Sequence, residues 1–179
     1  QAIGGHSGGV MYNLFEGNVI PGIAGDYIHG NQTMNTLFRN YLLGSDPGRI
    51  DNATAVRVDA WNRYWNVIGN VIGTPGYTTS YSVGDKAIYT LGIGYGTLPS
   101  DPLVETTMMR WGNYDTVNAS THWLDSEVPT GLTQYANPVP SLGTTFATTV
   151  VPFGTTGTVT LTVHTAWPDG VTSAFSKAA

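Results

Sequence analysis

One asparagine recurs inside three similar segments of the first 72 residues. The segments span 13–20, 35–42 and 65–72, and each carries asparagine at its sixth position: Asn18, Asn40 and Asn70. The three asparagines are 22 and then 30 residues apart. A repeat of this length is too short for a pair of helices and suits one coil of a β-solenoid. We attribute the longer second interval to a loop inserted at residues 44–49.

Asparagine has a physical reason to recur at the corner of a solenoid. The backbone bends there, and its amide groups point inward without partners in a strand ladder. An inward asparagine can bond to these groups and also to the asparagine of the next coil. We therefore expect Asn18, Asn40 and Asn70 to form one internal ladder, with the ~4.8 Å spacing of neighbouring strands.

Apolar columns flank the asparagines in all three segments. Three residues before them stand Phe15, Leu37 and Val67, and two residues after them stand Ile20, Leu42 and Ile72. Uniformly apolar columns are expected to face a core. The alternative is a β-sandwich in which the asparagines recur by chance, and the shared columns argue against it.

Several longer strings resemble one known class of protein. They are residues 5–18, 28–30, 36–40, 65–70, 110–115 and 135–140. In these strings the chain resembles the C-terminal portion of bacterial right-handed parallel β-helix repeat proteins of the pectate-lyase-like superfamily. The resemblance covers roughly residues 5–140 and implies the fold. It implies little about function, because that superfamily includes lyases, hydrolases, phage tail spikes and adhesins without catalytic activity.

The expected fold is all-β: a right-handed parallel β-helix of about four coils with a β-rich C-terminal appendage. The coils and an irregular wrap over their C-terminal end occupy residues 1–142. In that stretch we expect a strand over residues 105–111, with Met108 in the column of Leu37. The appendage occupies residues 143–179, where Thr alternates with apolar residues over 144–151 and 157–164. Such alternation is typical of antiparallel strands with one solvated face.

Composition excludes several functions and favours a secreted protein. Only 11% of the residues are charged, the net charge is −5 and the pI is near 5.1, so there is no basic surface for nucleic acid. The chain has no cysteine, which excludes disulfides, thiolate metal sites and cysteine catalysis. No apolar run is long enough for a membrane span. We expect an extracellular or cell-surface location and no cofactor.

A polar and aromatic surface is expected where the second strands of two coils are aligned. We align residues 27–31 with 57–61, which places Ile28 and Gly30 inside the coil. The outward residues then form a candidate glycan-binding surface: Tyr27, His29, Asn31, Arg57, Asp59, Trp61 and Arg63. Aromatic rings stack on the apolar faces of sugars while polar side chains bind hydroxyl groups. The alternative is structural pairing of these groups across neighbouring coils.

No complete catalytic site emerges from the sequence, so catalytic residues stay unknown. His29 beside Asp59 could act as an oriented general base. Glycoside hydrolysis needs two carboxylates across one bond, but our alignment puts Asp26 in the inward column of Val56. We expect His6 to be packed at the edge, and His122 and His164 have no companions that suggest zinc. We expect no metal site.

Three acceptor triplets for N-glycosylation begin at Asn31, Asn52 and Asn118. Such triplets arise often by chance in a chain rich in Asn and Thr. They matter only if the source organism glycosylates its secreted proteins.

The N-terminal edge is expected to need a partner. Residues 4–12 resemble the edge of a coil and contain no helix, proline or charged residue that would discourage strand pairing. Either further coils precede them or a neighbouring subunit docks there, as in a fibre. We expect an extracellular structural or glycan-binding module of a fibre, spike, filament or surface layer. The alternative is a polysaccharide lyase or glycoside hydrolase acting on an exposed β-helix face.

Overall fold

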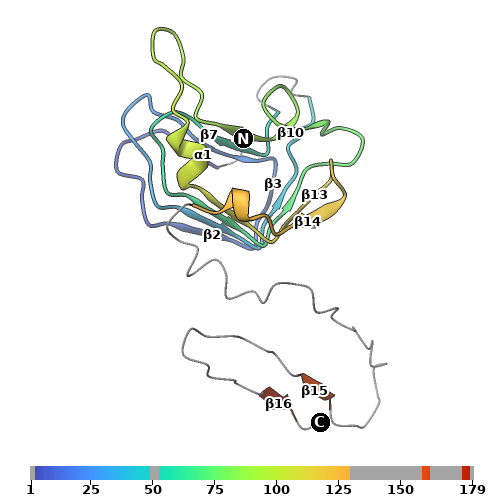
Figure 1. Cartoon of the computed structure of the whole chain (residues 1–179). Helices are drawn as coiled ribbons and strands as arrows, with labels where there is room; N and C mark the ends of the chain where they lie inside the picture. Colours follow the sequence, from blue (N-terminus) through green and yellow to red (C-terminus); the bar gives the residue numbers. More distant parts are fainter. Residues whose placement is uncertain (1–2, 49–52, 130–158, 162–174, 178–179) are drawn as a thin grey trace. The chain divides into compact units, whose positions relative to one another are not determined.

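The computed structural model describes residues 3–48, 53–129, 159–161 and 175–177. The chain divides into two compact units, residues 1–130 and residues 131–179. The first unit contains fourteen of the sixteen strands found in the described residues, and Figure 1 shows its strands arranged around a common interior. The expected boundary at residue 142 lies outside the described residues and stays a prediction.

The first unit is built from short strands and two single-turn helices. The strands are β1 Ile3–Gly5, β2 Leu14–Glu16, β3 Val19–Ile20, β4 Ile23–Gly25, β5 Thr36–Phe38, β6 Tyr41–Leu42, β7 Val56–Val58, β8 Asn66–Ile68, β9 Val71–Ile72, β10 Ser80–Ser82, β11 Ala87–Leu91, β12 Met109–Trp111, β13 Asn113–Asp115 and β14 Ser120–His122. The helices are α1 Leu103–Thr107 and the 3-10 turn η1 Asp125–Glu127.

Three mainly parallel sheets contain these strands, and the chain visits them in rotation. Sheet A has the order β1-β4-β7-β11-β10, sheet B the order β12-β8-β5-β2, and sheet C the order β14-β13-β9-β6-β3. Only β14 runs antiparallel to its neighbour in these three sheets of the described chain. Each pass through A, B and C is here called a circuit. The first three circuits add one strand to every sheet, and the fourth adds β10 and β11 to sheet A, β12 to sheet B, and β13 and β14 to sheet C. This all-β arrangement is compatible with the expected β-helix.

The corner between sheets B and C explains the recurrent asparagine. The residue before each asparagine has a left-handed backbone, with φ of 69° at Gly17, 53° at Arg39 and 63° at Gly69. This conformation turns the chain sharply between two strands and suits glycine best. The asparagine that follows satisfies the amide groups that the turn leaves without strand partners.

The corner asparagines form one continuous line of hydrogen bonds. The Asn18 side chain donates to Asn40 Oδ1 at 2.9 Å, Asn40 donates to Asn70 at 3.0 Å, and Asn70 donates to Asn113 at 3.0 Å. Each of these Oδ1 atoms also accepts the backbone N–H of the preceding asparagine. A second pair of this kind, Asn13 with Asn35, lies at the corner before sheet B.

The core lies between the three sheets and ends at a buried arginine. Phe15, Leu37 and Val67 are register partners, and the fourth circuit places Arg110 in their column. The expectation that Met108 would continue the Leu37 column is therefore wrong. Residues 103–107 form α1 instead of strand, so β12 begins only at Met109 and its register shifts.

A cluster of buried polar side chains surrounds Arg110 at the C-terminal end of the core. Arg110 lies 5.3 Å from the Tyr89 ring and bonds Glu105 at 3.1 Å. The buried Glu127 carboxylate is 3.9 Å from Arg110 and accepts the Tyr81 hydroxyl. Burial raises the pKa of both Tyr81 and Tyr89, so these phenols stay protonated. The cluster places polar groups at the end of the core, where Arg110 Nε and Glu127 Oε2 have no hydrogen-bond partner among the described residues.

The second unit is described over two strands. β15 Val159–Leu161 pairs antiparallel with β16 Phe175–Lys177. β15 falls inside the Thr-alternating stretch 157–164, whereas the stretch 144–151 lies outside the described residues. Over the described parts of both units, no helix has the length and apolar character needed to cross a lipid bilayer.

Candidate functional site

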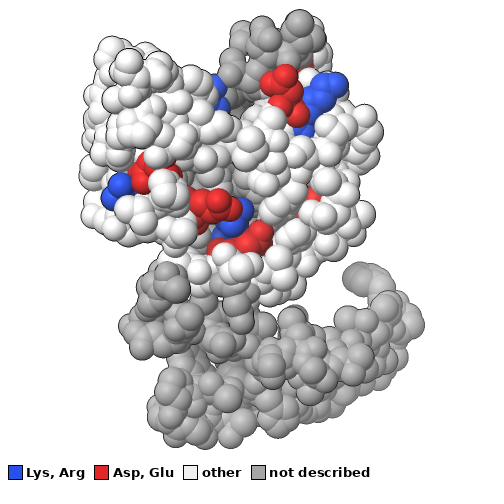
Figure 2. Space-filling view, turned by 45° about the horizontal axis from the view of Figure 1, so that its top comes forward, with Lys and Arg blue, Asp and Glu red and all other residues white. Residues whose placement is uncertain are grey.

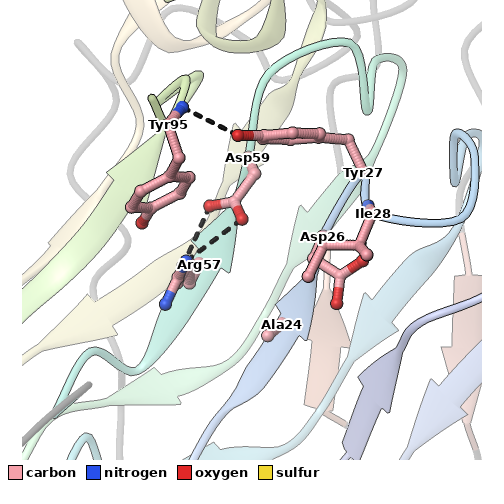
Figure 3. Close-up of a pocket in the computed structure, with 7 residues that line it drawn as sticks. All are labelled: Ala24, Asp26, Tyr27, Ile28, Arg57, Asp59 and Tyr95. Carbon is pink, nitrogen blue, oxygen red and sulfur yellow. Dashed lines mark hydrogen bonds and ion pairs between the residues drawn. The ribbon is translucent and has the colours of Figure 1, made fainter. Parts of the chain in front are cut away.

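A pocket of about 380 Å³ opens beside sheet A, where β4 and β7 end and the loop after β11 rises. Figure 3 shows the seven side chains around it: Ala24, Asp26, Tyr27, Ile28, Arg57, Asp59 and Tyr95. Ala24 and Arg57 are register partners on neighbouring strands. The remaining lining residues follow strands or stand in loops. The pocket therefore combines a rigid strand floor with loop-borne walls.

The register of β4 and β7 differs from the sequence alignment by three residues. Gly25 pairs with Val58, so Asp26 and Asp59 follow paired positions in adjacent circuits. The expectation that Asp26 would stand in the column of Val56 is wrong, because Val56 pairs with Ile23. Ile28 is likewise 63% exposed instead of facing the interior.

The cause of this shift is a longer connection in the second circuit. Residues 26–35 join β4 to β5, whereas residues 59–65 join β7 to β8, which is three residues fewer. An alignment counted backward from the asparagine ladder therefore pairs the wrong residues on sheet A. The strands that do pair read Ile-Ala-Gly-Asp at 23–26 and Val-Arg-Val-Asp at 56–59.

Arg57 and Asp59 form an ion pair in the pocket that is held by two hydrogen bonds. Arg57 donates from Nε to Asp59 Oδ1 at 2.9 Å and from Nη2 to Oδ2 at 3.1 Å. The Arg57 guanidinium also lies 5.0 Å from the Tyr95 ring centre. Asp59 is only 2% exposed. Burial raises the pKa of Asp59, the Arg57 bonds and charge oppose this, and the nearby Asp26 charge adds to it.

Aromatic side chains form one side of the pocket. The Tyr27 and Tyr95 rings stack with centroids 6.2 Å apart, and the Tyr27 hydroxyl accepts the Tyr95 backbone N–H at 2.7 Å. Trp61 meets Tyr27 edge to face at 5.9 Å, just outside the lining set. This contact joins two candidate residues of the sequence prediction to the loop at Tyr95.

Histidine and Asp26 meet at the N-terminal side of the pocket. His6 Nδ1 lies 2.5 Å from Asp26 Oδ2, and Asp26 Oδ1 accepts the Ile28 backbone N–H at 3.0 Å. The rings of His6 and His29 contact edge to face at 4.7 Å. The expected contact of His29 with Asp59 is therefore wrong. The expectation of a packed His6 is also wrong, since its side chain is 60% exposed.

The remaining candidates lie outside the pocket lining. Asn31 is exposed on the loop before β5. Arg63 donates to Asp101 at 2.8 Å and 3.2 Å, and Asp101 also accepts the Trp61 N–H at 3.0 Å. Burial alone would raise the pKa of Asp101, but the Arg63 and backbone hydrogen bonds outweigh it and lower that pKa. Arg63 thus holds the loop that carries Tyr95 and does not line the pocket.

The acceptor triplets have different surroundings. Asn31 is exposed and Asn52 lies outside the described residues. Asn118 is exposed, but its side chain donates to the buried Asp115 at 3.1 Å and 3.3 Å. Glycosylation at these positions stays a prediction.

Among the described side chains, no group of three or more His, Asp or Glu is placed to hold a metal ion. The two pocket carboxylates have other partners, Arg57 for Asp59 and His6 for Asp26. The arrangement suits the binding of an uncharged molecule that contacts both the rings and the hydrogen-bonding groups.

Sequence reasoning missed four lining residues: Ala24, Asp26, Ile28 and Tyr95. An Asp shared by both paired segments was the available signal for Asp26. Tyr95 lies in a glycine-rich loop with no counterpart in the earlier circuits, so no sequence repeat indicated it.

Comparisons with family models, curated proteins and solved structures find no match for this chain. The site is therefore interpreted from its own geometry.

Proposed function

We propose that this chain is a right-handed parallel β-helix module, similar to the pectate-lyase-like superfamily, that binds a polysaccharide outside the cell or at its surface. The rotation of the chain through three parallel sheets and the asparagine ladder support the β-helix assignment. The low content of charged residues supports the extracellular location. In Figure 2 the acidic and basic side chains form a few small groups separated by wide uncharged areas.

One observation carries the binding proposal: the pocket places two tyrosine rings beside polar groups that are already fixed. Tyr27 and Tyr95 both line the pocket, and aromatic side chains of this kind contact the C–H faces of sugar rings. Asp26 and the Tyr27 hydroxyl offer hydrogen bonds in the same space. Because the Arg57–Asp59 pair is made before any ligand binds, little side-chain ordering opposes binding.

A screen of the complete chain against soluble oligosaccharides tests this function. Tyr95→Ala and Tyr27→Ala should each weaken binding about tenfold, since each removes a contact surface worth about 1.5 kcal/mol. Trp61→Ala should weaken it less, because Trp61 acts only through Tyr27. Tyr114→Ala on sheet C is the matched control. Equal loss in that control would contradict the assignment of the pocket.

A structural role in an assembly is a second candidate, favoured by apolar rows on the outer faces of sheets B and C. One row is Val19, Tyr41, Val71 and Tyr114, and another contains Phe38, Ile68 and Trp111. Val19 is 70% exposed and Val71 is 42% exposed. Exposed apolar surface of this extent commonly marks contact with another protein. A neighbouring subunit would cover it in a fibre, spike, filament or surface layer.

The N-terminal edge is the other place for a partner, either a neighbouring subunit or preceding coils. Each ladder asparagine accepts from the preceding circuit and donates to the following one. Asn18 at the edge therefore presents its Oδ1 as an acceptor. A partner with amide donors at this corner would continue the ladder, whereas a second copy placed edge to edge would oppose acceptor to acceptor.

An enzyme acting on a polysaccharide is the alternative, favoured by the column that contains Asp26 and Asp59. The raised pKa of Asp59 is a feature of general acids. A lyase or a glycoside hydrolase would release unsaturated products or new reducing ends. Turnover that is lost in Asp26→Ala or Asp59→Ala would establish catalysis, while binding without turnover supports the module.

A further inference from the structure

We infer that the pocket beside sheet A selects a neutral, hydroxyl-rich saccharide and rejects its uronic acid counterpart. This inference rests on the glycan-binding function proposed above and adds the chemical class of the ligand. Its basis is the arrangement of the charged groups: the arginine is paired with one aspartate, and the other aspartate is accessible.

The lining contains one cation, Arg57, which is already paired with an aspartate. Two of its N–H groups bind the two oxygens of Asp59 and its guanidinium lies over the Tyr95 ring. A uronate carboxylate that took over this two-point contact would have to displace Asp59, which is 2% exposed and would be left buried without a partner. Leaving a buried charge without its partner costs several kcal/mol, more than one exposed ion pair returns.

Asp26 supplies the charge that an incoming group meets. Its side chain is 23% exposed, and its two oxygens contact the Ile28 N–H and His6 Nδ1. An ionised carboxylate has about four acceptor positions, so Asp26 can also accept sugar hydroxyl groups. The side chains of the lining comprise one arginine and two aspartates, a formal balance of −1 that disfavours anions.

Tyr27 complements this acceptor with a donor. Its hydroxyl oxygen accepts the Tyr95 N–H, so the phenolic proton remains for a ligand oxygen. Burial is the main cause that raises the pKa of the Tyr95 phenol, which keeps that group neutral as well. Aromatic faces, one donor and one charged acceptor together match a sugar with free hydroxyl groups and no carboxylate.

Calorimetric titration of the complete chain with matched hexasaccharides tests the inference. Each pair consists of a neutral oligomer and its counterpart oxidised to the uronate at C6. One pair is made of α-1,4-linked galactose and the other of β-1,4-linked glucose. In one pair the neutral member should bind at least tenfold more tightly than the uronate. Added salt should reduce this ratio of affinities, because it screens the charge of Asp26. Asp26→Asn keeps the acceptor for Ile28 and removes the charge, so it should narrow the same ratio by raising uronate affinity.

Asp85→Asn is the matched control, because Asp85 is exposed and lies outside the lining. It should leave the ratio unchanged, and urea midpoints should show that both variants are folded. A uronate that binds more tightly than its neutral partner contradicts the inference while leaving the glycan-binding function in place. Absence of binding by every hexasaccharide at millimolar concentration contradicts the glycan-binding function itself.

Discussion

Asp26 and Asp59 stand at the same position of adjacent circuits, directly after the register partners Gly25 and Val58. Their surroundings nevertheless differ. Asp59 is 2% exposed and bound by Arg57, whereas Asp26 reaches solvent and contacts the exposed His6. One carboxylate thus orders the pocket and the other remains accessible to a ligand. This division of roles is the basis of the proposed preference for neutral molecules over anions.

Asn40→Leu should destabilise the first unit by roughly 1–3 kcal/mol, because buried amide groups would lose their partners. Asn40 donates to Phe15 O at 2.8 Å and to Asn70 Oδ1 at 3.0 Å, and it accepts from Asn18. The urea midpoint measures the effect. Asn31→Leu at an exposed position is the control, and equal midpoints for the two variants would contradict a structural role of the ladder.

Asp101→Asn should weaken stability at neutral pH, and the weakening should disappear in acid. The pKa of Asp101 is lowered below its ordinary 3.8 on folding, so its contribution is present above that value and is lost as the pH falls through the lowered pKa. Charged hydrogen bonds of this kind contribute about 1.5–3 kcal/mol. Urea midpoints of both proteins between pH 7 and pH 2 give the difference. A difference that does not change over this range would contradict the assignment.

Asp59→Asn should show the opposite trend with pH. Burial raises the pKa of Asp59 above its ordinary 3.8 on folding. Its contribution is therefore present below 3.8 and is lost as the pH rises through the raised pKa. Relative to Asp59→Asn, the natural protein should become less stable as the pH rises from 3 toward neutrality. The same series of urea midpoints measures this, and a parallel response of Asp59→Asn and Asp101→Asn would be inconsistent with these environments.

Arg110→Met should cost about 3 kcal/mol or more, since it removes the arginine beside the buried Glu127 carboxylate. The double variant Arg110→Met, Glu127→Gln should recover part of this loss, because the stranded charge is removed as well. A double-mutant cycle from urea unfolding gives the coupling between the two residues. Arg39→Met is the control, since its pair with Glu16 is exposed and should change stability by less than about 1 kcal/mol. No coupling in the cycle would refute the role of the buried pair.

The N-terminal edge should exchange its amide hydrogens faster in isolated chains than in assemblies. β2 ends sheet B and β3 ends sheet C, so their outer backbone groups have no strand partner in the described residues. Hydrogen exchange at residues 4–20, combined with sedimentation, measures both protection and mass. Val71→Lys should reduce any assembly that uses the row on sheet C. A stable 19.1 kDa monomer with well-protected amides at residues 4–12 would contradict the need for a partner.

The asparagine spacing predicted the corner between sheets B and C because that corner has the same length in every circuit. One left-handed residue and one asparagine separate the strands each time, so the flanking apolar columns align without gaps. The interval between ladder asparagines was harder to interpret. From the second to the third circuit the connection before sheet A lengthens from 21–22 to 43–55, while the next shortens from 26–35 to 59–65. Eleven residues are gained and three are lost, so the second interval between ladder asparagines is eight residues longer than the first.

The pocket could be predicted only in part, because it lies beyond both variable connections. Tyr27, Arg57, Asp59 and Trp61 were found as a group, but counting from the ladder displaced their register by three residues. The shared Asp after 23–25 and 56–58 would have corrected it. Tyr95 and α1 belong to a connection that occurs once, so no repeat could reveal them. Arg110 in an apolar column breaks the pattern that made the other positions predictable.

Chemical-shift mapping of isotope-labelled protein, titrated with the tightest neutral hexasaccharide, tests the proposed binding site most directly. Saturable shifts should concentrate at Asp26, Tyr27, Ile28 and Tyr95, and Tyr95→Ala should weaken the fitted affinity about tenfold. Tyr114→Ala should leave it unchanged. Saturable shifts confined to the outer rows of sheets B and C, with full affinity retained in Tyr95→Ala, would contradict the account.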